Sequence, residues 1–319
     1  MSSIPVFDLK ELADSDSSED EYKKLREACE EWGCFRIVNH NIPLDLMREM
    51  KSVVKSLFEL PTQVKKKNSN VIPYSGYVGP NETNSRFESI GLYQLASSKA
   101  IHDFCNDLGA SPNQREIIEN YAGGIVELMM DIGRKLAKSM GLVDVGLFNR
   151  SWDTTLRLHN YNFSPNFIGS TGLITHSDSG FLTIVQDDED VGGLQVMTKS
   201  GSFVAVDPRP VGSFLLNIGD VGKVWSNARW YNAKHRVECK EGNARVSMAA
   251  FLLGPTDAEI EAPRELVDDE HPRLFVPFTY QNYRKLRLTS PSPGTDETLS
   301  DFRAPTPVAT RHHSSKNTL

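Results

Sequence analysis

The chain has 319 residues, 39% of them hydrophobic, and a formal net charge of −7 at pH 7. It can bury a sizeable core, and its acidic balance argues against a nucleic-acid partner, which would favour a basic face. No apolar run approaches the roughly 20 residues that cross a bilayer. Residues 1–5 lack the features of a secretory signal, and the four cysteines lack CxxC spacing. We therefore expect a cytoplasmic protein with free thiols and no membrane partner, either a monomer or a weak homodimer.

Residues 1–150 have the pattern of a helical region. Alternating apolar side chains predict two short strands, at residues 4–9 and 35–40. Residues 73–80 are rich in Gly and Pro and are expected to form a loop. Apolar side chains at helical spacing, with Pro and Gly at the ends, predict three helices, at residues 22–32, 43–61 and 111–141.

From residue 151 the pattern changes to short segments of strand character separated by turn signals. Such spacing favours a sandwich or barrel, so we predict an α+β fold with a double-stranded β-helix (jelly-roll) core at residues 151–256. The helices of residues 1–150 would brace this core, and a C-terminal helical segment would follow at 257–288. The tail, 289–319, is rich in Ser, Thr and Pro and is expected to be disordered. The core strands are predicted at residues 155–161, 173–175, 181–186, 193–197, 203–206, 213–218 and 246–253.

His176 and Asp178 follow one of these strands, and His235 lies 57 positions beyond Asp178. Alternate side chains of an extended segment project to one face, so His176 and Asp178 should point the same way. Two imidazoles and one carboxylate suit non-haem Fe(II) and leave coordination positions open. A structural zinc site would instead be closed by four ligands. The alternative, a capping histidine at 176 and a surface histidine at 235, loses weight because of an arginine further along the chain.

That arginine is Arg245, which is followed by Ser247 on the same side of a predicted apolar strand. A buried guanidinium needs a partner, and its planar fork matches a carboxylate bidentately. Arg245 and Ser247 could therefore hold the distal carboxylate of a 2-oxo diacid. Tyr161 could add its hydroxyl, although an ordinary core tyrosine is an equal alternative.

Together these motifs resemble those of the plant-type Fe(II)/2-oxoglutarate-dependent dioxygenases, from Ile4 to about Leu288. The H-x-D, H and R-x-S constellation is highly specific for that superfamily. Within it, the chain is most similar to the dioxygenases for auxin oxidation. The similar stretches are residues 73–80, 175–184, 190–194, 225–227, 234–237 and 251–255.

The resemblance implies a set of cofactors and a role for each site residue. Fe(II), 2-oxoglutarate and O2 would be required, with ascorbate as a candidate reductant. Asp178 argues for hydroxylation or desaturation, since related halogenases have Gly or Ala there. The implied iron ligands and catalytic residues are His176, Asp178 and His235, and the implied 2-oxoglutarate-binding residues are Arg245, Ser247 and Tyr161.

The resemblance implies a small-molecule substrate, indole-3-acetic acid, which the auxin-oxidising group converts to its 2-oxindole product. Two departures from that group, at residues 157–161 and 228–232, leave other substrates open. The alternatives are the same chemistry on a specialised metabolite such as an alkaloid and, from another class, a catalytically silent ligand-binding protein. Large apolar side chains are pocket candidates, although core packing explains each of them at least as well. They are Tyr77, Phe87, Leu182, Phe251, Phe278 and, first among them, Trp230.

Overall fold

The computed structural model describes residues 3–13, 18–69, 72, 75–82, 84–142, 151–207, 210–290 and 296–305. Its largest element is a seven-stranded sheet of order β1-β2-β9-β6-β11-β4-β3. The β1–β2 pair is parallel, and the other neighbours are antiparallel. Its strands are β1 (Val6–Asp8), β2 (Cys34–Val38), β3 (Phe87–Tyr93), β4 (Trp152–Tyr161), β6 (Leu182–Gln186), β9 (Phe214–Ile218) and β11 (Arg245–Pro255).

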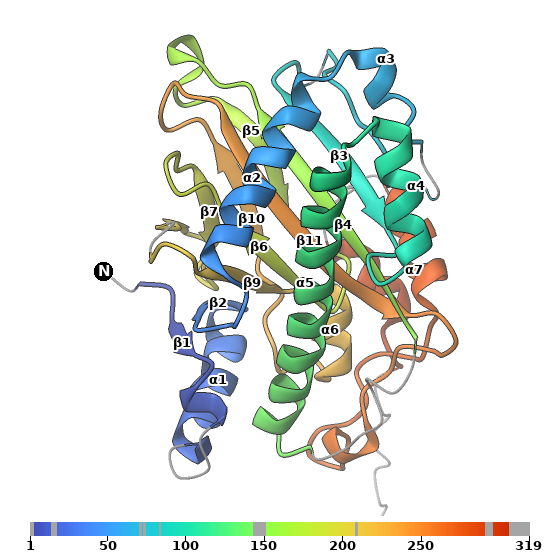
Figure 1. The fold of residues 1–319 in the computed structure, drawn as a ribbon. Helices are drawn as coiled ribbons and strands as arrows, with labels where there is room; N and C mark the ends of the chain where they lie inside the picture. Colours follow the sequence, from blue (N-terminus) through green and yellow to red (C-terminus); the bar gives the residue numbers. More distant parts are fainter. Residues whose placement is uncertain are drawn as a thin grey trace, which may run out of the picture.

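A second, four-stranded sheet faces the first. Its order is β5-β10-β7-β8, with β5 (Thr171–His176), β7 (Leu194–Met197), β8 (Phe203–Ala205) and β10 (His235–Glu238). Buried side chains from both sheets, such as Val185, Leu215, Val196 and Val237, form one hydrophobic cluster between them. Two sheets packed face to face with helices on one outer side confirm the predicted α+β jelly roll (Figure 1).

Helices cover the outer face of the large sheet. In Figure 1, α2 (Leu44–Glu59) and α5 (Pro112–Ser139) run across it, and α2, α1 and α4 all contact α5. The start of α5 is the predicted one: Ser111 and Gln114 form a capping box, and Pro112 is the first helical residue. The other helices are α1 (Ser18–Glu31), α3 (Thr62–Lys65), α4 (Ser98–Leu108), α6 (Asp220–Trp225) and α7 (Tyr280–Thr289), with 3-10 turns at Glu11–Ala13, Pro165–Phe167, Arg264–Leu266 and Asp296–Phe302.

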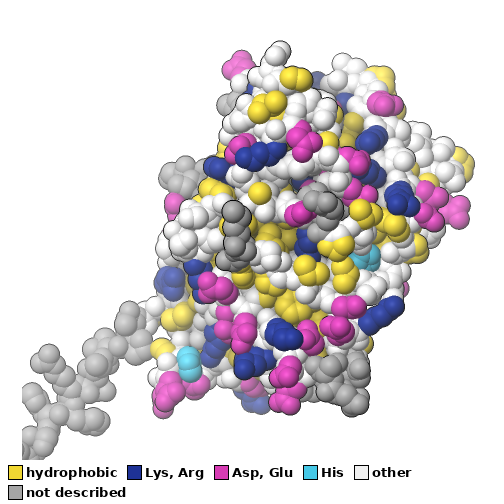
Figure 2. All heavy atoms as spheres, turned by 90° about the vertical axis from the view of Figure 1, so that its left-hand side faces the viewer, with side chains coloured by type: hydrophobic (Ala, Val, Ile, Leu, Met, Phe, Trp, Pro, Cys, Tyr) yellow, Lys and Arg dark blue, Asp and Glu magenta, His cyan; other side chains and the backbone are white. Residues whose placement is uncertain are grey.

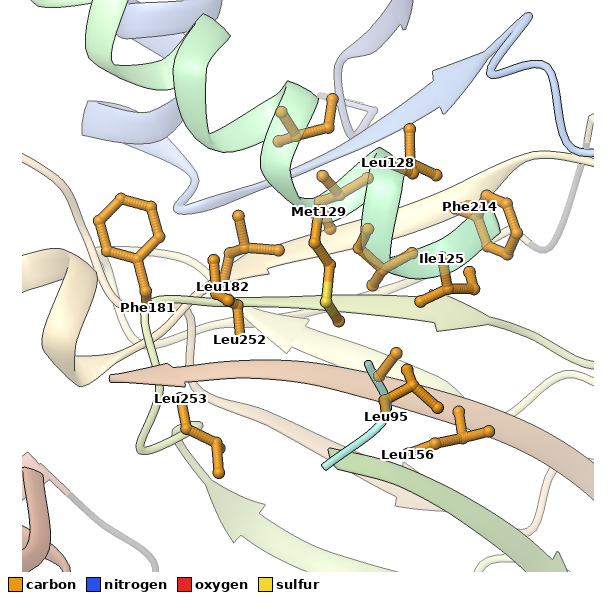
Figure 3. Close-up of a cluster of buried hydrophobic side chains, with 14 of the residues drawn as sticks. Leu95, Ile125, Leu128, Met129, Leu156, Phe181, Leu182, Phe214, Leu252 and Leu253 are labelled. Atoms are coloured by element: carbon orange, nitrogen blue, oxygen red, sulfur yellow. The ribbon is translucent and has the colours of Figure 1, made fainter. Parts of the chain in front are cut away.

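The alternation of side chains along β11 separates the core from the site. Met248, Ala250 and Leu252 belong to the cluster beneath the helices, where side chains such as Met129 of α5 meet the sheet (Figure 3). The intervening positions face the second sheet, and Arg245 and Ser247 are among them. Burying one face of this strand against α5 thus directs the other face into the barrel.

Several elements were not predicted from the sequence. Strand β3, within the predicted helical region of residues 1–150, is one of them. It joins the large sheet together with β1 and β2, which correspond to the two short strands predicted at residues 4–9 and 35–40, so the sheet crosses the boundary placed at residue 150. Strand β10 and helices α3, α4 and α6 were not predicted either.

The expected disorder of the tail is wrong for residues 289–290, at the end of α7, and for residues 296–305. Leu299 is buried there, and the Phe302 ring stacks on Phe278 with ring centroids 4.2 Å apart. These apolar contacts hold a segment whose composition predicted disorder. The remainder of the expected tail, 291–295 and 306–319, lies outside the described residues.

The surface carries charges of both signs. Figure 2 shows acidic and basic side chains mixed on one face, with hydrophobic side chains gathered toward its middle. Among the described helices none combines the length and apolar character needed to cross a bilayer. All four cysteines are buried and free.

Candidate active site

The three predicted metal ligands converge at the edge of the smaller sheet. His176 ends β5, His235 begins β10, and the two residues are opposite each other in the antiparallel pair. Asp178 Oδ1 lies 3.8 Å from His176 Nε2 and 3.7 Å from His235 Nε2. The candidate ligand atoms all lie within 4.8 Å of one another, a spacing that one ion can bridge. Adjacent strands bring together residues that the sequence separates by 57 positions.

Hydrogen bonds orient each of these side chains. The Nδ1 atom of His176 lies 2.9 Å from the Ile174 carbonyl oxygen, and that of His235 lies 3.1 Å from the Ala233 carbonyl oxygen. An Nδ1–H that donates to a carbonyl leaves the lone pair on Nε2, the atom that faces the centre of the triad. The Thr183 hydroxyl donates to Asp178 Oδ2 at 2.6 Å, which leaves Oδ1 directed at the two imidazoles.

The electrostatics of the triad favour the protonation states that bind metal. Burial, with the neighbouring His235, lowers the pKa of His176 to about 4. Burial alone would raise the pKa of Asp178, but His235 and His176 outweigh it and the pKa is lowered. A neutral imidazole and an ionised carboxylate are the ligand forms that a divalent cation requires.

Arg245 lies further inside the barrel, opposite Tyr161 of β4 and only 1% exposed. Its Nη1 donates to Ser247 Oγ at 3.3 Å, and the Tyr161 ring centroid lies 5.2 Å from its guanidinium carbon. The buried Nε has no hydrogen-bond partner within the described protein. Because an unpaired buried donor is costly, this N–H fits a ligand carboxylate. The donor set therefore fits both a divalent metal and a dicarboxylate co-substrate.

Asp187 is a site residue that the sequence reasoning missed. Its carboxylate accepts a hydrogen bond from Arg245 Nη2 and lies 3.8 Å from Nη2 of Arg36, which is also buried. Asp187 thus links the two buried arginines at this end of the barrel. The only signal was an acidic run, residues 187–190, directly after a strand of buried residues.

A cavity of 370 Å³ opens onto His176 and Asp178. Phe87 and Phe251, two of the predicted pocket residues, line it. Tyr77 is adjacent to the lining residue Val78, and its hydroxyl donates to Glu88 at 3.0 Å.

The other three predicted pocket residues lie in the hydrophobic core. Trp230, the leading candidate, is 1% exposed, packs with ring centroids 5.2 Å from Trp225 and donates from Nε1 to Met140 Sδ at 3.2 Å. Leu182 is on the helix-covered face of β6, and Phe278 packs against Phe302. Proximity to His235 in the sequence was misleading because the chain turns between Trp230 and β10.

The arginines of the cavity were not predicted as substrate residues. Arg157 of β4 lines it with Arg284 and Arg287 of α7. Arg157 was noted only as part of a departure from the auxin-oxidising group. The two on α7 could not be placed, because a position on a C-terminal helix does not reveal which cavity the helix faces.

Comparisons with known proteins agree with this arrangement. Residues 4–111 match the family described as non-haem dioxygenase in morphine synthesis N-terminal, and residues 152–254 match the 2OG-Fe(II) oxygenase superfamily. The chain is 45% identical over 291 residues to the 2-oxoglutarate-dependent dioxygenase DAO of Oryza sativa subsp. indica, covering 91% of this chain and 96% of that protein. The chain belongs to the plant 2-oxoglutarate-dependent dioxygenases.

Solved structures of other dioxygenases share the fold. Dioxygenase for auxin oxidation 1 from Arabidopsis thaliana, in a binary complex with 2-oxoglutarate, matches with a TM-score of 0.80 and 48% identity, covering 85% of this chain and 100% of that chain. JOX2 in complex with 2OG, Fe and JA matches with a TM-score of 0.81 and 29% identity, covering 95% and 90%. The present dioxygenase therefore depends on iron and 2-oxoglutarate, like the other members of its family. When bound, they couple decarboxylation of the 2-oxo acid to the activation of O2 for oxidation of a second substrate.

Proposed function

We propose that this dioxygenase oxidises indole-3-acetic acid, or a closely similar aromatic carboxylic acid, to a product that carries one additional oxygen atom. His176, Asp178 and His235 would hold the iron. Arg245, Ser247 and Tyr161 would bind the distal carboxylate of 2-oxoglutarate. The observation that supports this choice of substrate is that arginine and aromatic side chains line the same cavity, beside the triad.

The arginines that line this cavity suit an anionic ligand. Arg157 donates to the Gly76 carbonyl oxygen at 2.7 Å and to the Ser89 hydroxyl. Burial and the positive charge of Arg284 together lower the pKa of Arg157 to about 10. An anionic ligand in this cavity would interact favourably with the arginines that line it. A cationic amine, the usual form of an alkaloid at neutral pH, would be disfavoured.

The apolar lining of the cavity suits a flat apolar ring. Phe87, Phe251, Leu173 and Leu253 contribute this apolar surface. Aromatic rings in contact gain energy beyond their buried area, which favours an aryl group over a flexible chain. Similarity to DAO of rice and to dioxygenase for auxin oxidation 1 of Arabidopsis thaliana supports the same substrate.

The test is succinate formation by the iron-loaded enzyme with 2-oxoglutarate and a matched set of indoles. Indole-3-acetic acid should give turnover, its neutral amide less, and the cationic amine tryptamine least. Replacing Arg284 with Gln should raise KM for the acid while leaving the affinity for 2-oxoglutarate unchanged. Lys285→Gln, an exposed neighbour on the same helix, is the matched control.

Two outcomes would contradict the proposal. Turnover of an alkaloid or amine in preference to every acid would indicate that the substrate is a specialised metabolite. Turnover with none of the compounds, in a protein that still binds ligands, would indicate a catalytically silent binding protein.

We further propose that the enzyme acts in the cytoplasm as a monomer or weak homodimer, without nucleic-acid or membrane partners. The acidic net charge and the mixed charges on the surface in Figure 2 support this. Sedimentation at micromolar concentration tests the assembly state, and a stable higher oligomer would contradict it.

A further inference from the structure

A buried acid beside the triad, Asp220, accepts hydrogen bonds from three side chains. It is the first residue of α6 and is 0% exposed. Asn232 Nδ2 donates to Oδ1 at 2.7 Å, and the Tyr283 hydroxyl donates to Oδ2 at 2.5 Å. Arg287 Nη1 donates to the same Oδ2 in a buried ion pair.

The partners of Asp220 extend to both segments that carry metal ligands. Asn232 is three residues before His235, and the Asp220 backbone N–H donates to the Asp178 carbonyl oxygen at 2.8 Å. Arg287 also donates to the carbonyl oxygen of Ser177, the residue between His176 and Asp178. The network therefore joins the His176–Asp178 segment, the approach to His235 and the C-terminal helix α7.

We propose that Asp220 and Arg287 are positioning residues for the iron site, and that α7 is thereby a structural part of that site. Neither side chain takes part in the metal cluster; each acts through the backbone or side chains next to the ligands. Arg287 fixes the Ser177 peptide, which sets the direction in which the two flanking ligands project. Asp220 fixes Asn232 and, through its own N–H, the Asp178 peptide.

The cost of such a network supports a positioning role. Burying an ion pair is expensive, and apolar side chains of similar volume would often fill the space with no loss of stability. What apolar side chains cannot do is hold two peptide groups in a fixed orientation. Partners one step removed from a metal commonly govern its affinity in this way.

The experiment is an anaerobic Fe(II) titration of the metal-free protein, with no substrate or turnover involved. Arg287→Gln should weaken Fe(II) binding by about 10- to 100-fold, the usual size for loss of such a partner. Lys285→Gln removes one charge from the exposed side of the same helix and should bind Fe(II) like the wild type. Arg287→Lys, which keeps the charge and loses the planar fork, should recover part of the affinity.

A merely structural role predicts a different result. A folded Arg287→Gln protein with a lower melting temperature but wild-type Fe(II) affinity would overturn the inference. If that variant does not fold, Tyr283→Phe removes one hydrogen bond from Asp220, and unchanged affinity in both Tyr283→Phe and Arg287→Lys would overturn it instead. The inference rests on the proposed ligands, so His176→Ala is titrated in parallel. Retained Fe(II) binding in His176→Ala would contradict the ligand set itself, a separate failure.

Discussion

One nitrogen of the buried Arg245 guanidinium has no hydrogen-bond partner in the described part of the protein. Ser247 and Asp187 take Nη1 and Nη2, and Nε remains without a partner. The sequence pattern was enough to predict Arg245 and Ser247 as site residues, since both lie on one face of an obvious strand. It was not enough to predict Asp187, because the contact between Asp187 and Arg245 depends on how β6 pairs with β11.

Replacing Arg245 with Gln should weaken the binding of 2-oxoglutarate by about 10- to 100-fold, since a hydrogen bond to a charged group contributes about 1.5–3 kcal/mol. Fe(II) affinity should change little, because Arg245 is not among the metal-cluster residues. Calorimetric titration of 2-oxoglutarate into metal-loaded protein measures the effect. Ser247→Ala should show a smaller loss. Wild-type affinity in the Arg245 variant would contradict the assignment.

Trp230 lies in the hydrophobic core and Phe251 lines the cavity, so replacing them should have different effects. Trp230→Ala should lower the free energy of unfolding by about 3–5 kcal/mol, since it empties a fully buried site. Phe251→Ala should cost less stability and raise KM for the organic substrate, because this ring lines the cavity. Urea denaturation and initial rates separate the two effects. A Trp230 variant of normal stability and altered substrate preference would restore the original prediction for that residue.

Two histidines should make the metal-free protein sensitive to acid. Burial lowers the pKa of His176 to about 4, and burial with Arg157 and Arg245 lowers that of His159. Below the ordinary histidine pKa of about 6.5 the unfolded chain binds protons that the folded chain does not. Stability is therefore fully present above about pH 6.5 and falls as the pH drops toward 4.

Urea denaturation of the metal-free protein between about pH 7 and pH 5 measures this loss. His159→Asn should reduce the dependence on pH, and His102→Gln, at an exposed position of α4, should leave it as in the wild type. An identical pH dependence in the wild type and His159→Asn would show that His159 is not held neutral.

At the scale of elements, the segments with clear periodicity or turn signals were predicted, and those without such signals, such as β3, β10 and α4, were not. Helix α5 and strand β11 have clear apolar periodicity, and α5 also has recognisable caps. Strands β3 and β10 are ordered by pairing with neighbours that lie far away in the chain. Their own residues carry no alternation strong enough to identify them. The candidate metal site also depends on pairing between distant segments, because the β10–β5 pairing places His235 opposite His176.

The cap of α5 gives a prediction at this scale. Ser111 Oγ accepts from the Gln114 N–H at 3.2 Å, and Gln114 Oε1 accepts from the Ser111 N–H at 2.8 Å. Ser111→Ala should lower the free energy of unfolding by about 1 kcal/mol. KM for 2-oxoglutarate should not change, since α5 contacts the outer face of the sheet. Thermal and urea unfolding measure the loss, and undiminished stability would mean that other contacts hold the start of this helix.

At the scale of the whole molecule, the two faces of the large sheet have different roles. The helix-covered face of the large sheet provides most of the core, and the inner face provides Arg245, Ser247 and the cavity arginine Arg157. Helix α7 also lines the cavity, and its Arg287 donates a hydrogen bond to the Ser177 carbonyl oxygen, between the candidate ligands His176 and Asp178. The sequence motifs could indicate the chemistry. The shape and charge of the cavity, which bear on the substrate, required the assembled molecule.

The central claim is that iron at His176, Asp178 and His235 couples 2-oxoglutarate decarboxylation to oxidation of an aromatic carboxylic acid. Its most direct test is turnover of indole-3-acetic acid under isotopically labelled O2, with mass analysis of both products. We predict one labelled oxygen atom in succinate and one in the oxidised acid, formed in equal amounts, and no product from His176→Ala. Labelled succinate with an unchanged acid, or equal turnover by His176→Ala, would contradict the account.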